Sequence, residues 1–130
     1  MNDILTKNLF TKCPLLYTDK NASIQVSLIP FGFECDDGWY KILEDLSLKL
    51  EKLIEQYIKE YPEVEYPPRA SQVKEKYGTL RFYMSGETDE MSKLIDEAEK
   101  LSEKTCEECG EPGRLRGTSW IKTLCNECTK

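Results

Sequence analysis

Two C-x-x-C pairs near the C-terminus constrain this chain more than any other feature. The first pair is Cys106 and Cys109 and the second is Cys125 and Cys128, with fifteen residues between the pairs. This spacing is typical of a four-cysteine zinc site. Two residues between cysteines allow one tight turn to direct both sulfurs at a single ion, and four thiolates complete a tetrahedron. The sequence therefore predicts one bound ion per chain, Zn²⁺ in the first instance, with iron as the alternative.

The absence of histidine limits the chemistry available to such a site. The chain has 130 residues with six cysteines and no histidine. A Ser-His-Asp triad, a Cys-His dyad and a histidine-ligated catalytic zinc all need an imidazole. Four protein ligands also leave no coordination position for water, so we expect a structural ion and no enzymatic activity. A redox-active thiol pair and an iron–sulfur cluster stay open as alternatives.

The residues between the cysteine pairs have the pattern of a zinc ribbon. Arg114–Arg116 and 120–124 are predicted to form short strands around 117–119. Gly110, directly after the first pair, frees the backbone to curl under the metal. The two remaining cysteines, Cys13 and Cys35, have no neighbouring partner and are predicted to be small buried apolar residues.

Hydrophobic periodicity predicts the elements of the N-terminal half. Apolar residues at helical spacing predict a short helix over residues 3–10. Alternation of Ile24, Val26 and Leu28 with polar residues predicts a half-buried strand over residues 23–29.

A long amphipathic helix is the strongest periodic signal in the chain. Apolar residues recur at steps of three and four from Trp39 to Tyr61, and Pro62 ends the pattern. Asp36 and Asp37 precede this helix, and we expect them to act as its cap and dipole partners.

A β-hairpin and a second helix follow. Residues 71–76 and 79–84 are predicted strands around Tyr77-Gly78. Thr88 is the expected N-cap of a helix that runs to Lys104. The apolar face of this helix is predicted to comprise Met91, Leu94, Ile95, Ala98 and Leu101.

These elements predict an α+β fold. A small β-sheet, made of the N-terminal strand and the central hairpin, is packed by two main helices. Residues 1–104 form this α+β domain, and residues 105–130 form a C-terminal zinc ribbon packed on it or appended to it.

The net charge of −6 makes some partners unfavourable. The charge is concentrated on the two predicted helices, with net −3 over residues 36–61 and net −4 over residues 87–104. An acidic protein is repelled by duplex nucleic acid and by anionic membranes. No apolar run has the length of a membrane span, and the N-terminus lacks the pattern of a signal peptide. We therefore expect a cytoplasmic protein without a membrane partner, whose paired thiols bind metal.

Basic and aromatic residues gather in two places despite the acidic total. The hairpin carries four cations with two tyrosines, and the ribbon carries three cations with Trp120. Guanidinium groups pair with phosphate and aromatic rings stack on bases, although outward cations also protect strand edges from pairing. The candidate ligand-binding or partner-binding residues are Lys74, Lys76, Arg81, Tyr83, Arg114, Arg116 and Trp120.

The order of motifs resembles a family of small proteins encoded by bacteriophages and prophages. The resemblance covers nearly the whole chain. It rests on Cys13-Pro14-Leu15-Leu16-Tyr17, on residues 31–40 (FGFECDDGWY), on residues 72–83 (QVKEKYGTLRFY), and on residues 105–113 (TCEECGEPG) with Trp120 and Thr123-Leu124-Cys125. The resemblance implies a phage accessory protein that acts in the cytoplasm of a bacterial host.

Three hypotheses for function follow from the sequence and the resemblance. The leading one is a non-enzymatic, zinc-stabilised protein that binds a host bacterial factor, for example a defence component, and inhibits or redirects it. Its acidic helical faces would compete for a basic surface of that target. The second is a binder of an anionic nucleotide that sequesters a signalling molecule. The third is a nucleic-acid-binding regulator that uses the ribbon.

Overall fold

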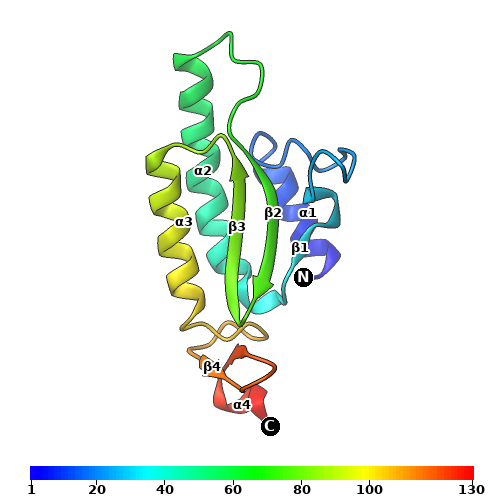
Figure 1. Ribbon diagram of the computed structural model, residues 1–130, viewed down its shortest axis with the longest axis vertical. Coiled ribbons are helices and arrows are strands. Elements are labelled where there is room, and N and C mark those ends of the chain that lie inside the picture. Colours follow the sequence, from blue (N-terminus) through cyan, green and yellow to red (C-terminus); the bar gives the residue numbers. More distant parts are fainter.

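A three-stranded sheet with helices on one face organises most of the chain (Figure 1). The computed structural model describes residues 1–130. Strand β1 (Phe33–Glu34) runs parallel to the central strand β2 (Arg69–Lys76), which pairs antiparallel with β3 (Thr79–Ser85). In Figure 1, helix α2 (Tyr40–Glu60) passes behind β3, and helix α3 (Asp89–Ser102) packs against α2 and lies beside β3. The predicted α+β fold is confirmed.

Shorter elements complete the chain. Helix α1 (Asp3–Lys12) packs against α2, and two 3-10 turns, η1 (Ile29–Phe31) and η2 (Asp37–Trp39), flank β1. After α3 come the paired strands β4 (Arg114–Arg116) and β5 (Lys122–Leu124) and the short helix α4 (Asn126–Thr129). This C-terminal segment lies below the tip of the β2–β3 hairpin in Figure 1, and its cysteine cluster fits the predicted zinc ribbon. None of the helices combines the length and apolar character that crossing a membrane requires.

The hydrophobic core lies between the sheet and the helices. The α2 stripe is buried as its periodicity predicts, with Trp39, Leu43 and Leu50 at 0% exposure. In α3 the prediction is wrong for Leu101, which is 52% exposed, because Ser102 points inward instead. The Ser102 hydroxyl accepts a hydrogen bond from Leu80 N at 2.9 Å, which satisfies a backbone donor of β3. A polar side chain therefore takes an inward position because the sheet edge needs an acceptor there.

Side chains of α3 close the free edge of β3. Besides the bond to Ser102, Phe82 N donates to Glu99 Oε2 at 2.9 Å. Burial raises the pKa of the Glu99 carboxyl. Unpaired strand donors are the template for edge-to-edge association, so these two bonds protect this side of the sheet.

The predicted strand over residues 23–29 is wrong. Ser23 O accepts from Val26 N at 2.8 Å and from Ser27 N at 3.0 Å, so the segment curls into turns and leads into η1. The Ser23 hydroxyl also accepts from Gln25 N, a local bond that competes with a strand ladder. The sheet takes only the two residues of β1 as its N-terminal strand. As a result Ile24, Val26 and Leu28, expected in the core, are exposed.

The two aspartates lie at the expected end of the helix but make no capping bond: Asp36 is the N-cap residue of η2 and Asp37 lies in its first turn, without a side-chain capping hydrogen bond. Trp39 occupies the N-cap position of α2 and makes no side-chain capping bond. Asp37 instead accepts from the backbone and side-chain nitrogens of Asn2, and Asp36 pairs with Lys122 of the ribbon at 3.3 Å. Both carboxylates tie distant segments to the start of α2.

A buried carboxylate on α2 fixes the turn after α1. Glu51 is 6% exposed and accepts from Leu15 N at 3.0 Å and from Leu16 N at 2.7 Å. The sequence pattern gave no indication of this role, because Glu51 lies among charged residues on a helix.

Replacing Glu51 with glutamine is therefore expected to destabilise the fold by about 2 kcal/mol, since hydrogen bonds to a charged acceptor are worth about 1.5–3 kcal/mol. The glutamine amide offers one acceptor for two backbone donors. Urea unfolding measures the change, and Glu55→Gln on the exposed side of α2 is the control. Equal stability of the two variants would contradict the assignment.

Candidate metal centre

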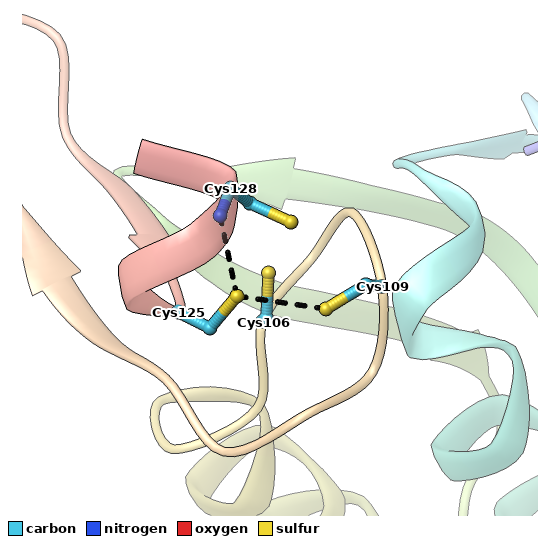
Figure 2. A group of neighbouring side chains, drawn as sticks. All are labelled: Cys106, Cys109, Cys125 and Cys128. Atoms are coloured by element: carbon cyan, nitrogen blue, oxygen red, sulfur yellow. Dashed lines mark hydrogen bonds between the residues drawn. The ribbon is translucent and has the colours of Figure 1, made fainter. Parts of the chain in front are cut away.

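The four cysteine sulfurs of the ribbon converge on one point (Figure 2). All four lie within 4.8 Å of one another, and Cys109 Sγ lies 3.6 Å from Cys125 Sγ. Tetrahedral coordination with metal–sulfur bonds of about 2.3 Å separates the sulfurs by about 3.8 Å. The cluster therefore has the size and the donor set for one thiophilic ion with no further ligand. These are the four cysteines that the spacing predicts as ligands.

Backbone turns position each pair of sulfurs. In the first pair, Gly110 N donates to Cys106 O at 2.9 Å, and Gly110 adopts a φ of 85°. This left-handed conformation is accessible to glycine without strain, in agreement with its predicted role. In the second pair, Cys125 is the N-cap of α4, and its sulfur accepts from Cys128 N at 3.4 Å (Figure 2). Each pair is thus a tight turn that directs two sulfurs to the same side.

The thiols of the cluster differ in the direction of their pKa shifts. Burial alone would raise the pKa of Cys106, but hydrogen bonds from the backbone outweigh burial and lower its pKa to about 7. Hydrogen bonding with Cys125 and Cys109 raises the pKa of Cys128. Because a metal binds the thiolate form, a bound cation would displace the protons that these thiols carry.

The cluster is anchored to the end of the sheet. Thr123 of β5 donates to Gly78 O at 2.7 Å, at the hairpin tip. Trp39 Nε1 donates to Thr105 O at 2.9 Å, and Gly38 N donates to Glu107 O at 2.6 Å. Residues of the first cysteine turn therefore contact the backbone where η2 leads into α2.

Glu107, between the first two ligands, is buried against this junction. It is 3% exposed, and its Oε2 accepts from Asp36 N at 3.0 Å. Its Oε1 is buried without a hydrogen-bond partner, and burial raises the pKa of the carboxyl. No local sequence pattern indicates this burial, because the contact joins residues 71 positions apart.

The two cysteines outside the cluster are buried, as predicted. Cys13 is 0% exposed and Cys35 is 7% exposed. Burial raises the pKa of each thiol to about 12. Since the thiolate is the reactive form, neither is activated as a nucleophile.

Alkylation with iodoacetamide is therefore expected to separate the six cysteines into two groups. After a chelator removes the metal, the four ribbon cysteines become labelled. Cys13 and Cys35 stay unlabelled until the protein is unfolded with denaturant. Peptide mass spectrometry measures each site, and labelling of Cys35 in the folded protein would contradict its placement in the core.

The predicted binding residues of the hairpin do not form a single site. Lys74 and Tyr83 line one groove, whereas Lys76 lies over the ring of Tyr77 at 5.7 Å. Arg81 faces a separate pocket beside the acidic side chains of α3, such as Asp96.

The cations of the ribbon are partly engaged in holding its own fold. Arg116 donates to Leu124 O at 2.9 Å and to Asn126 Oδ1 at 2.7 Å. Arg114 is exposed, and Trp120 is 80% exposed. Of the predicted binding residues in the ribbon, Arg114 and Trp120 are therefore the ones available to a ligand.

Comparison with protein-family models, curated proteins and solved structures finds no match to this chain.

Proposed function

We propose that this protein is a non-enzymatic, zinc-stabilised binding protein that inhibits or redirects a protein of a bacterial host. The resemblance to phage accessory proteins supports action in the host cytoplasm. Four cysteine sulfurs within 4.8 Å of one another, with no other donor type among them, support Zn²⁺ as the ion and a structural role for it. The ion would hold the ribbon in one conformation at the end of the sheet.

The observation that carries this proposal is a groove with exposed apolar walls on the outer face of the sheet. The groove has a volume of about 580 Å³ and lies between the 24–28 segment and the strands β2 and β3. Ile24 is 57% exposed, Val26 69% and Tyr83 41%. Exposed apolar side chains gathered at one site are typical of interaction surfaces, because covering them stabilises a complex.

A capture experiment tests this proposal. The tagged protein is incubated with lysate of the bacterial host, and bound proteins are identified by mass spectrometry. Val26→Asp places a charge on the groove wall and is expected to reduce recovery of the specific partner at least tenfold. Ile4→Asp is the matched control, because Ile4 is 74% exposed on α1 and does not line the groove. Equal recovery with wild type and Val26→Asp would contradict the proposal.

An anionic nucleotide is the second candidate, because Lys74 and Tyr83 line the same groove. An ammonium group beside an aromatic ring can bind a phosphate and stack a base. In that case a nucleotide panel would raise the melting temperature of the protein, and Lys74→Ala would remove the increase. No increase with any nucleotide would leave the protein partner as the sole proposal.

A further inference from the structure

Along the length of β2, the outer face of the sheet has an apolar end and a basic end. At the apolar end, Tyr83 stands opposite Gln72 beside the groove. Toward the hairpin tip, Lys74 and then Lys76 follow on β2. Neither lysine takes part in an ion pair. The segment of the face between groove and tip is therefore open to an anionic partner.

The other charges of this face leave it positive. Arg81 on β3 stands opposite Lys74 but lies beside the acidic side chains of α3. Of the remaining charges, Lys74 and Lys76 meet one carboxylate, Glu34 on β1 opposite Lys74. The whole chain, by contrast, has a net charge of −6. A positive face on an acidic protein selects an acidic partner by charge complementarity and disfavours basic ones.

The spacing along β2 defines the shape of that partner. A strand rises about 3.3 Å per residue, so Lys74 lies about 7 Å and Lys76 about 13 Å from Gln72. In an extended peptide, side chains on one face also recur every second residue. If such a peptide lies along β2 with an apolar side chain in the groove, its side chains two and four positions further along would lie above Lys74 and Lys76.

From this geometry, and resting on the proposed function, we infer that the outer face binds an extended acidic segment of the partner protein. The segment carries a large apolar residue in the groove and acidic residues two and four positions away, in either chain direction. The groove favours such a peptide over single-stranded nucleic acid, because its walls are half apolar and Lys74 is its one charged lining residue.

Titration of the ¹⁵N-labelled protein with synthetic peptides tests this inference. The probe is a seven-residue peptide with phenylalanine at position 2, glutamate at positions 4 and 6 and serine elsewhere, together with its reversed sequence. One comparison peptide has lysine for glutamate, and another has the glutamates moved to positions 3 and 5. A twelve-nucleotide oligo(dT) is titrated in parallel. The readout is the amide shifts of the outer face and the dissociation constant.

We expect one orientation of the acidic probe to shift the amides of Val26, Lys74 and Tyr83 with a dissociation constant near 1 mM, about −4 kcal/mol. The lysine peptide is expected to bind at least tenfold more weakly and the displaced-glutamate peptide at least threefold more weakly. The double variant Lys74→Gln/Lys76→Gln should weaken binding of the acidic probe at least fivefold. Lys52→Gln/Lys93→Gln makes the same charge change on exposed helix positions and should leave binding unchanged.

The remaining outcomes overturn the inference. Equal binding of the lysine peptide, or an unchanged affinity in the Lys74→Gln/Lys76→Gln variant, would exclude selection for acidic segments. Shifts of these amides by oligo(dT) without shifts by any peptide would assign the face to single-stranded nucleic acid. No shift with any probe would also reject the acidic segment. In each case a loss of partner capture by Val26→Asp would still support the proposed function, so the two failures are distinguishable.

Discussion

Substitution of Cys106 by serine is expected to abolish stoichiometric metal binding and to unfold residues 105–130. Cys106 is fully buried and supplies one of four sulfurs that lie within 4.8 Å of one another. Structural zinc sites contribute about 10–16 kcal/mol of binding free energy that becomes folding free energy. Metal content by elemental analysis and amide dispersion in NMR spectra measure the two effects.

The matched control removes a buried cysteine that is not a ligand. Cys13→Ala is expected to lower stability by about 1–2 kcal/mol, as is usual for core substitutions, while one metal ion per chain is retained. Treatment of the wild type with a chelator should reproduce the Cys106→Ser spectrum. A fully folded ribbon in the Cys106→Ser variant would show that the metal does not stabilise this segment.

The second large effect is expected from Gly38→Ala. A Cβ at this position would overlap the carbonyl oxygens of Cys106 and Glu107, which belong to the backbone and cannot rotate away. The backbone N–H of Gly38 also donates to Glu107 O, so displacement of Gly38 would break this hydrogen bond as well. Overpacking costs about 1–3 kcal/mol and the lost hydrogen bond about 1 kcal/mol more. We expect a decrease in melting temperature of about 10 °C and weaker metal binding.

Gly86→Ala is the control for Gly38→Ala. It tests the effect of a positive φ on stability at a position where a Cβ meets no close backbone atom. Gly86 has a φ of 74°, and a Cβ there would meet Pro68 at an ordinary distance of 3.7 Å. This variant is expected to lose about 1 kcal/mol from left-handed strain and to keep its metal affinity. If both glycine variants lost the same stability and neither changed metal affinity, the junction at Gly38 would not support the metal centre.

The four-cysteine cluster could be predicted from the sequence because its information is local. Two residues between cysteines determine the turn, and Gly110 identifies where the backbone reverses. The long helices could be predicted for the same reason, since their periodicity extends over many turns. The two-residue hairpin turn could also be predicted from the sequence. Both of its residues, Tyr77 and Gly78, have the positive φ that such a turn requires.

What the sequence did not predict depends on contacts between distant segments. Alternating Ile24, Val26 and Leu28 satisfy the pattern of a strand, but Ser23 closes a turn and the sheet takes Phe33 instead. The prediction that Leu101 is buried was wrong because Ser102 points inward, where its hydroxyl accepts a hydrogen bond from Leu80 N at the edge of the sheet. Because the wrongly predicted strand placed Ile24, Val26 and Leu28 in the core, the groove that these residues line was not predicted from the sequence.

The ribbon junction was hidden for the same reason. The burial of Glu107 and the close approach at Gly38 involve residues about seventy positions apart, and no local pattern encodes them. Only the folded chain shows that the cysteine cluster is part of the end of the sheet.

X-ray absorption spectroscopy at the zinc K edge of the purified protein tests the central claim most directly. A closed structural centre predicts one zinc per chain with four sulfur ligands at about 2.3 Å and no lighter ligand. A coordinating nitrogen or oxygen at about 2.0–2.1 Å, or a protein without stoichiometric zinc, would contradict it.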